Sequence, residues 1–273
     1  MTYSIIRKSG GMLAVRTPLV DGNRLALKIE RVHKGIELNI VADSPRLAVR
    51  DVSHNARSDT WFFTVQAKDV ISDKALAKIT VSATEVPRGR SFPVLSANFE
   101  LFEQIELPRQ ETDASMLVRL FLMEAPSPLM QAKFGYTRED TKLSMQYMKC
   151  VIQNRLDNNP KQFGAAGAAS YRDIVRAPGQ FAAFEGYSAA GFMHNHLLNI
   201  MAEINNATKA AWKKYREFYA DAVEVAGAPV IANPPGFTPY FWRTQGSGSP
   251  GGRADTANTR TIAGNVFYGL KDG

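Results

Sequence analysis

The most informative stretch for the fold is residues 113–124, which read Asp-Ala-Ser-Met-Leu-Val-Arg-Leu-Phe-Leu-Met-Glu. Apolar side chains recur in this stretch at helical spacing, at Met116, Leu117, Leu120, Phe121 and Met123. This spacing puts them on one broad face and predicts a helix whose face is buried. Pro126 and Pro128 end the helix, because proline disfavours the helical conformation of the residue before it. We expect helical structure from about residue 113 onward.

The chain before this helix has the pattern of β-strands. Polar and apolar residues alternate at 36–40 and 77–81, residues 61–65 are aromatic and β-branched, and apolar residues at 101–107 suggest a further strand. Several short strands separated by turn residues predict a β-sandwich. We therefore expect an α+β protein, with a β-rich binding or docking domain at 1–112 and a mainly helical domain at 113–273.

Local signals predict further elements in the helical region. Thr137 with Asp140 three residues later resembles a capping box and predicts the start of a second helix. Its buried face would hold Leu143, Tyr147, Cys150, Val151 and Asn154. Residues 157–170 and 246–252 are expected to be loops, and a long helix is expected from about 190 to 224. Residues 261–268 have the pattern of a strand.

Composition limits the classes of protein this chain can belong to. The net charge of +7 favours a polyanionic partner or reflects ordinary solubility, and no basic block with interleaved aromatic residues predicts a nucleic-acid groove. The single cysteine, Cys150, has no partner for an intrachain disulfide and fits a core position. No segment has the roughly 18 apolar residues of a membrane span. The N-terminus has no signal-peptide pattern, so we expect synthesis in the cytoplasm.

Several short segments follow one another along the helical region. They are Arg119-Leu-Phe-Leu-Met-Glu-Ala125, Tyr147-Met-Lys-Cys-Val-Ile-Gln-Asn-Arg-Leu156, Tyr171-Arg-Asp-Ile174, Pro178-Gly-Gln-Phe181, Phe241-Trp242 and Ile262-Ala-Gly-Asn-Val-Phe-Tyr268. In this order they resemble the cell-wall hydrolase family of the spore cortex-lytic enzymes. That family has a Glu-Ala helix end, an Asn-Arg helix, a Gln-Phe turn and a closing Ile-Gly-Asn-His-x-Phe-Tyr strand. The resemblance covers the chain from residue 115 to residue 270.

The chain departs from the family pattern at three places. Residues 126–128 are Pro-Ser-Pro, where family members often have a glycine and a second glutamate. Asn265 stands where the closing motif usually has histidine. Residues 183–235 include the long predicted helix and have the character of an insertion. These differences concern the substrate subsites and leave the family's catalytic glutamate matched to Glu124.

The resemblance implies a lysozyme-like helical fold with a small β element. It also implies cleavage between N-acetylmuramic acid and N-acetylglucosamine in peptidoglycan, often by a lytic transglycosylase mechanism. Glu124 would be the acid/base residue, because a carboxylate half inside the core at a helix end has a raised pKa, as a general acid requires. Spacing alone favours a solvated helix-end residue for Glu124, and the order of the motifs changes that interpretation. No metal or cofactor is implied.

The substrate-binding residues expected from the resemblance are Gln180, Phe181, Tyr240, Trp242 and Tyr268. Gln180 could bond an acetamido or hydroxyl group, and the aromatic residues Phe181, Tyr240 and Trp242 could stack on sugars. Tyr268 could orient Glu124 or the transition state. Core packing or turn structure is the alternative for each of them. Asn154 and Arg155 are interpreted as structural.

A second carboxylate would be needed for simple hydrolysis. The candidates are Asp157, Asp173 and Glu185, and Asp173 also fits a helix-capping role. His194 and His196 do not predict a metal site, because residues two apart on a helix point in different directions.

Other functions stay open at this stage. Muramidase or amidase action of phage-lysis origin is one, and a non-catalytic wall-binding or structural protein is another. A wall-degrading enzyme without a signal peptide needs another route out of the cell. One hypothesis is an antibacterial effector of a type VI secretion apparatus that acts in the periplasm of a target cell. The expected partners are peptidoglycan strands and, in that case, a secretion-apparatus or immunity protein.

Overall fold

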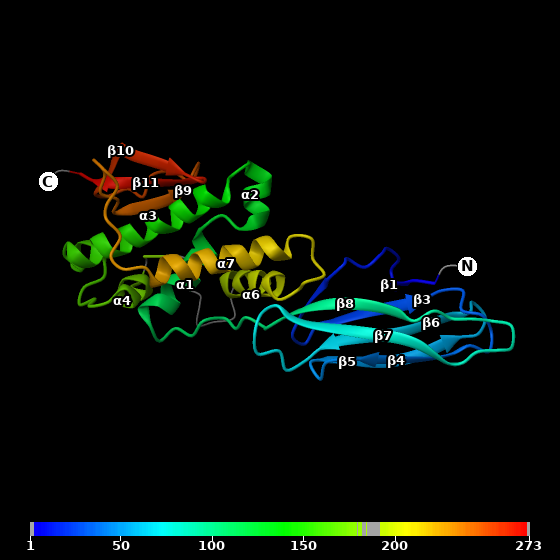
Figure 1. Cartoon of the computed structure of the whole chain (residues 1–273). Coiled ribbons are helices and arrows are strands. Elements are labelled where there is room, and N and C mark those ends of the chain that lie inside the picture. Colours follow the sequence, from blue (N-terminus) through cyan, green and yellow to red (C-terminus); the bar gives the residue numbers. More distant parts are fainter. Residues whose placement is uncertain (1–2, 179, 182–183, 185–191, 272–273) are drawn as a thin grey trace. The chain divides into compact units, whose positions relative to one another are not determined.

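The computed structural model describes residues 3–178, 180–181, 184 and 192–271. It confirms the α+β class. The chain divides into two compact units, Met1–Ile105 with Asn205–Ala210, and Glu106–Ile204 with Ala211–Gly273. Figure 1 shows strands alone in the first unit and helices with a small sheet in the second.

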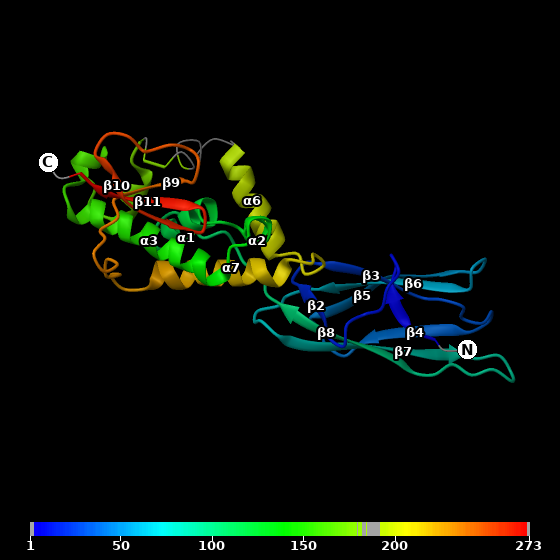
Figure 2. The ribbon, with the colours of Figure 1, turned by 90° about the horizontal axis from the view of Figure 1, so that it is seen from above.

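The first unit is a sandwich of two four-stranded sheets (Figures 1 and 2). One sheet has the order β1 (Ile5–Arg7), β3 (Arg24–Ile29), β6 (Thr60–Ala67) and β5 (Leu47–Asn55). The other has the order β2 (Thr17–Val20), β8 (Leu95–Phe102), β7 (Ala75–Glu85) and β4 (Glu37–Ala42). Leu27 and Phe63 of one sheet share a single buried cluster with Ile79 and Phe99 of the other. This common core is what makes the unit a sandwich.

The predicted alternation is confirmed in β4 and β7, and the aromatic and β-branched run at 61–65 lies in β6 as predicted. The strand expected at 101–107 is placed wrongly. β8 ends at Phe102. Ile105 is held instead by one side chain: the Ile105 N–H donates to Asn205 Oδ1 at 2.9 Å, and Asn205 Nδ2 donates to the Ile105 carbonyl at 2.8 Å. The amide group of Asn205 thus satisfies the backbone that a strand partner would have satisfied.

The second unit is built around helix α1, Asp113–Glu124. Every residue from Met116 to Met123 is buried, as the apolar pattern predicts. The other helices are α2 (Pro128–Phe134), α3 (Arg138–Asp157), η1 (Pro160–Phe163), α4 (Tyr171–Arg176), α6 (Phe192–Ile204) and α7 (Trp212–Gly227). Helix α1 contacts α3, α4, α6 and α7, so its end is held on several sides.

Helix α3 begins as predicted. Its capping box is present, with Thr137 Oγ1 accepting from the Asp140 N–H at 3.0 Å. Tyr147, Cys150 and Val151 are buried on its inner side, but the expectation for Leu143 is wrong, because its exposed fraction is 40%. The helix also carries Lys149, which is buried and donates to the carbonyls of Val225, Ala226 and Ala228.

The single helix predicted from 190 to 224 is two helices, α6 and α7. Asn206 forms a turn between them, its Oδ1 accepting from the Thr208 N–H at 3.1 Å. The indole of Trp212 donates to the Ile204 carbonyl at 2.9 Å and so satisfies the end of α6. The predicted apolar stripe is real but is divided between two helices.

The strand predicted at 261–268 is part of a hairpin. A three-stranded antiparallel sheet has the order β10 (Ala254–Ile262), β11 (Asn265–Leu270) and β9 (Phe241–Thr244). Ala263 and Gly264 both have positive φ, 47° and 75°, which suits a two-residue hairpin turn. A Cβ at Gly264 would lie 2.5 Å from the hydroxyl oxygen of Tyr136, so a side chain there would collide.

No helix in the described part of the chain is both long enough and apolar enough to cross a membrane.

Candidate active site

Glu124 lies where helix α1 stops. The next residue, Ala125, is extended, with φ −81° and ψ 149°, and its N–H donates to the Phe121 carbonyl at 2.9 Å. Pro126 follows, which disfavours continuation of the helix. Since the preceding turns of α1 are buried, the carboxyl group emerges half-buried from the core.

Glu124 lines a cavity of about 650 Å³, a size that suits a small ligand or part of a polymer. The cavity lies between the end of α1, the end of α3 and the small sheet. Its walls are Glu124, Arg155, residues 162–164, Gln180, Phe181, residues 241–244, Ser247 and residues 250–253. The predicted loop at 246–252 therefore forms one wall.

The environment of Glu124 raises the pKa of its carboxyl group. Burial is the largest cause, because it disfavours the charged form. The hydrogen bond from Trp242 Nε1 to Glu124 Oε2, at 3.5 Å, and the charge of Arg243 act in the opposite direction. Burial outweighs both, and the outcome is a carboxyl group that holds its proton at higher pH than an ordinary glutamate does. That is what a general acid requires.

Asn265 positions the end of helix α1. It is buried at the start of β11, and its Nδ2 donates to the Glu124 carbonyl at 3.4 Å and to Ser144 Oγ at 3.2 Å. The small sheet is thereby tied to the backbone of Glu124 and to α3. Asn265 is not among the residues that line the cavity, so it acts on the site through the backbone.

Three of the residues predicted to bind substrate lie in this cavity with Glu124. They are Gln180, Phe181 and Trp242. The rings of Phe181 and Trp242 stack, with centroids 4.8 Å apart and planes inclined by 24°. Both rings are buried, so each contributes to packing and also forms part of the cavity wall.

The other two predicted residues, Tyr240 and Tyr268, do not line the cavity. Tyr240 stacks on Phe163 with centroids 5.6 Å apart, and its hydroxyl accepts from Asn158 Nδ2 at 3.3 Å. Its N–H donates to the carbonyl of Tyr268, which is buried in β11. Both tyrosines support the wall of the cavity from behind.

Arg155 is a cavity residue that sequence reasoning treated as structural. Its Nε donates to the Tyr240 carbonyl at 2.7 Å, and its Nη1 donates to Gln180 Oε1 at 2.8 Å. It therefore holds the wall together and also faces the ligand space. A signal was present, because Arg155 follows Val151 by four residues and so continues the buried face of α3.

The candidate second carboxylates do not join Glu124. Asp157 and Asp173 are absent from the cavity walls, and Glu185 lies outside the described residues. Asp173 accepts from the Ala169 N–H at 3.1 Å, which lowers the pKa of its carboxyl group, and its own N–H donates to Ser170 Oγ at the start of α4. Its position is that of a helix-end residue.

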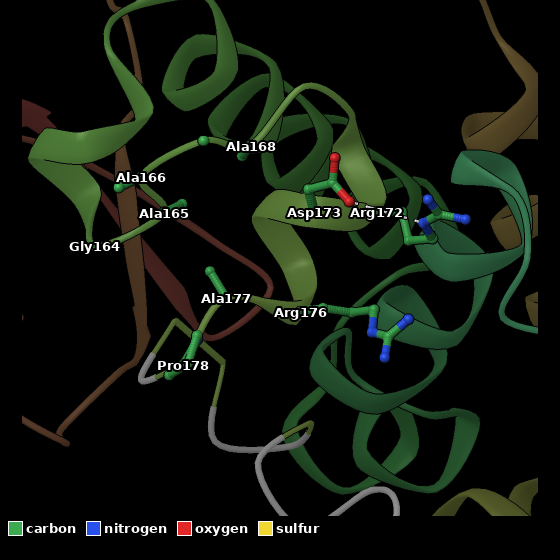
Figure 3. Close-up of a pocket in the computed structure, with 10 residues that line it drawn as sticks. Gly164, Ala165, Ala166, Ala168, Arg172, Asp173, Arg176, Ala177 and Pro178 are labelled. Atoms are coloured by element: carbon green, nitrogen blue, oxygen red, sulfur yellow. Dashed lines mark ion pairs between the residues drawn. The ribbon is translucent and has the colours of Figure 1, made fainter.

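Asp173 lines a smaller depression of about 360 Å³ beside the cavity, shown in Figure 3. The walls are residues 164–168, Arg172, Asp173 and residues 176–178. Figure 3 shows the ion pair between Arg172 and Asp173, whose Nε and Oδ1 atoms are 3.9 Å apart. Gly164 lines both this depression and the larger cavity.

Neither metal chemistry nor thiol chemistry is suggested by the described residues. Within ranges 3–178 and 192–271, no three His, Cys, Asp or Glu side chains form a group able to hold a metal ion. Burial raises the pKa of the Cys150 thiol to about 11, so the reactive thiolate is scarce at neutral pH.

Comparisons with known proteins assign no family. No protein-family model matches this chain, and no curated protein matches it. Among solved structures, a Bacteroides ovatus GH5 xyloglucanase in complex with a XXXG heptasaccharide aligns over 46% of this chain and 26% of its own, with 17% identity and a TM-score of 0.24. A polysaccharide lyase aligns over 81% of this chain and 39% of its own, with 9% identity and a TM-score of 0.25.

A third solved structure, the M1 domain from titin, aligns over 38% of this chain and 94% of its own, with 12% identity and a TM-score of 0.22. The chain spans well under half of the length of the xyloglucanase and of the lyase. Two of these three structures are carbohydrate-active enzymes, but TM-scores of 0.22 to 0.25 establish neither a family nor an activity.

Proposed function

We propose that this protein cleaves the glycan strand of peptidoglycan between N-acetylmuramic acid and N-acetylglucosamine, as a lytic transglycosylase. One observation carries the proposal: Glu124 is the only Asp or Glu in the described walls of the cavity, and burial raises its pKa. Phe181 and Trp242 add apolar aromatic surface to the same walls, which supports a ligand with apolar faces, such as a sugar.

A single carboxyl group suffices for this reaction. Protonated Glu124 gives its proton to the glycosidic oxygen as the bond to the anomeric carbon breaks and positive charge develops on the sugar ring. The resulting carboxylate then takes the proton from the 6-hydroxyl of the same sugar, whose oxygen bonds to the anomeric carbon and closes a 1,6-anhydro ring. Glu124 ends in its starting state, and no water is consumed. Hydrolysis would instead require a second group to activate water.

The test is digestion of purified sacculi by the wild type and by Glu124→Gln. This substitution keeps the shape of the side chain and removes its proton transfer. We expect 1,6-anhydro-muropeptides from the wild type, and a rate about 10²–10⁴-fold lower in the variant, the usual contribution of a general acid/base. Glu139→Gln is the matched control, because Glu139 is exposed in the first turn of α3 and is not a cavity residue.

Mass spectrometry of the products separates the competing reactions. Reducing muramic ends without the anhydro ring would indicate muramidase action, and released stem peptides would indicate amidase action. Sacculi that remain intact with well-folded wild-type protein would refute glycan cleavage. Equal activity of Glu124→Gln and the wild type would refute the role of Glu124.

Delivery to the periplasm of a target cell is a second part of the proposal, because peptidoglycan lies there. A type VI secretion apparatus is the proposed route, with the β-sandwich unit as the adaptor and an immunity protein as the partner of the producing cell. Expression with and without a periplasmic signal tests this. Toxicity only in the periplasm is expected, and toxicity only in the cytoplasm would contradict it.

A further inference from the structure

We propose that Arg155 binds a carboxylate of the glycan inside the cavity that Glu124 lines. The inference rests on the proposed function, because it takes this cavity as the place where the glycan lies. It adds a chemical preference to that function: the ligand should carry a negative charge near the bond that is cleaved.

Arg155 is a buried cation, and the described part of the chain gives it no acidic partner. Its exposed fraction is 6%, and no Asp or Glu among the described residues forms an ion pair with it. The acceptors it does have, the carbonyl of Tyr240 and the amide oxygen of Gln180, are neutral. Burying a charge is costly unless an opposite charge compensates it. The free protein therefore leaves this cost only partly offset.

Aromatic rings provide part of the offset. Arg155 Cζ lies 5.6 Å, 5.5 Å and 5.2 Å from the ring centroids of Phe163, Phe181 and Phe241. Ring faces attract a cation, which helps to keep the guanidinium charged and fixed in place. They accept no conventional hydrogen bond, so the donor capacity of the guanidinium remains.

Part of the hydrogen-bond donor capacity of Arg155 is unused by the described residues. Arg155 uses Nε and Nη1, while Nη2 has no hydrogen-bond partner among the described residues. The edge formed by Nη1 and Nη2 matches the spacing of two carboxylate oxygens, the arrangement that makes arginine the preferred carboxylate binder. Arg155 is held in position before any ligand arrives, which lowers the entropy lost on binding.

The charge of the cavity walls also favours an anion. Among the described wall residues are three arginines, Arg155, Arg243 and Arg253, and one acid, Glu124. Arg243 and Arg253 are exposed and Arg155 is buried, so positive charge extends from the rim to the interior. Such a gradient attracts an anionic ligand and orients it with its charge inward.

Peptidoglycan strands offer carboxylates from two sources. One is the ether-linked lactyl group of N-acetylmuramic acid, which is a free carboxylate when the stem peptide has been removed. The other is the stem peptide itself. The chemistry that Arg155 recognises is the same in both cases, and the experiment must distinguish them.

The experiment measures binding separately from cleavage. Glu124→Gln protein, in which we expect cleavage to be about 10²–10⁴-fold slower, is titrated calorimetrically with muramic-acid-containing oligosaccharides of one length. Two forms are used, without and with stem peptides, each with free carboxylates and after conversion of the carboxylates to methylamides. We expect the free acid of one form to bind about 10- to 100-fold more tightly than its amide, the usual strength of hydrogen bonds to a charged group. The form that shows this difference identifies the carboxylate.

The protein side is tested in the same background. Arg155→Lys keeps the charge but loses the paired donors, and Arg155→Gln loses both, so the preference for the acid should fall in the first and disappear in the second. Arg172→Gln is the matched control, because it removes an arginine from the neighbouring depression and should leave the preference unchanged. The amidated ligands test the inference on an unaltered Arg155 even if its variants do not fold.

Equal binding of acids and amides in both forms would overturn the inference, and so would the absence of binding to all four ligands. Cleavage of sacculi without a preference for acids would sustain the proposed function and refute the role of Arg155. A preference for acids without cleavage of sacculi would support carboxylate binding by Arg155 and refute the proposed cleavage.

Discussion

Replacing Lys149 by methionine should destabilise the helical unit by about 3 kcal/mol. The Lys149 Nζ donates to the carbonyls of Val225, Ala226 and Ala228 at 3.0, 3.1 and 2.5 Å, and so closes the C-terminal end of α7. Two of the three carbonyls belong to buried residues, and each unsatisfied buried group costs about 1–3 kcal/mol. Burial of the charged ammonium group is itself unfavourable and lowers the Lys149 pKa. The methionine variant avoids this unfavourable term, which offsets part of the lost stability.

Lys142→Met is the matched control on the same helix. Lys142 lies two turns earlier on α3, and its close partner at 2.7 Å is Glu224, whose side chain is 66% exposed. Buried Asp221 is 4.0 Å from Lys142 but is bound directly by Arg138 at 2.6 Å, so it keeps its partner when Lys142 is replaced. Exposed ion pairs contribute only about 0–1 kcal/mol, because water screens them. The two variants therefore remove the same charge from one helix face and differ in the burial of its partners.

The assay is urea unfolding followed by circular dichroism at the helical band. All described helices belong to the second unit, so this signal reports on that unit. The expected result is a lower midpoint for Lys149→Met with an unchanged slope. If both variants lose the same amount, or if Lys149→Met loses less than about 0.5 kcal/mol, then Lys149 does not close α7 as described.

Three further predictions concern charge. Arg243→Gln removes a charge that lowers the Glu124 pKa, so this pKa should rise further; a fall in a carbon-13 titration would contradict the assignment. Glu124→Gln and the wild type should be equally stable below the ordinary glutamate pKa. As pH rises through the raised pKa of folded Glu124, the wild type should lose stability and the variant should not, because the fold favours the protonated glutamate. Urea unfolding at several pH values measures the difference. Arg138→Gln removes hydrogen bonds of 2.6 and 2.8 Å from buried Asp221 and leaves Lys142 as the nearest cation, 4.0 Å away. Unfolding measurements should show a loss of stability of about 2 kcal/mol. This is less than the value for a fully buried ion pair, because Arg138 is half exposed.

The predictions that held depend on short stretches of chain. Helix α1, its end near Pro126 and the capping box at Thr137 were all predictable, since each involves residues within a few positions of one another. The predictions that were wrong involve distant partners. The 190–224 pattern is continuous in its apolar residues. The structure divides it at residues 205–210, which group with the first unit and in which Asn205 binds Ile105, 100 residues away.

Leu143 illustrates the same limit on the buried face of α3. Helical spacing places it near the apolar stripe, but which edge of a broad stripe is covered depends on where neighbouring helices lie. Arg155 was interpreted as structural from its position on α3, and its place in the cavity wall was not predicted. The structure shows it buried, with acceptors on other segments.

By itself, the sequence determined that a carboxyl group, Glu124, stands at the end of a buried helix, because apolar spacing and a following proline are local properties of the chain. Tertiary structure decided what surrounds that group. Trp242, which donates to it, is 118 residues away, and Arg155 meets the Tyr240 carbonyl across 85 residues. Contacts at such separations arise only when helices and the small sheet pack together. That packing desolvates Glu124, raises its pKa and turns a helix-end glutamate into a candidate acid.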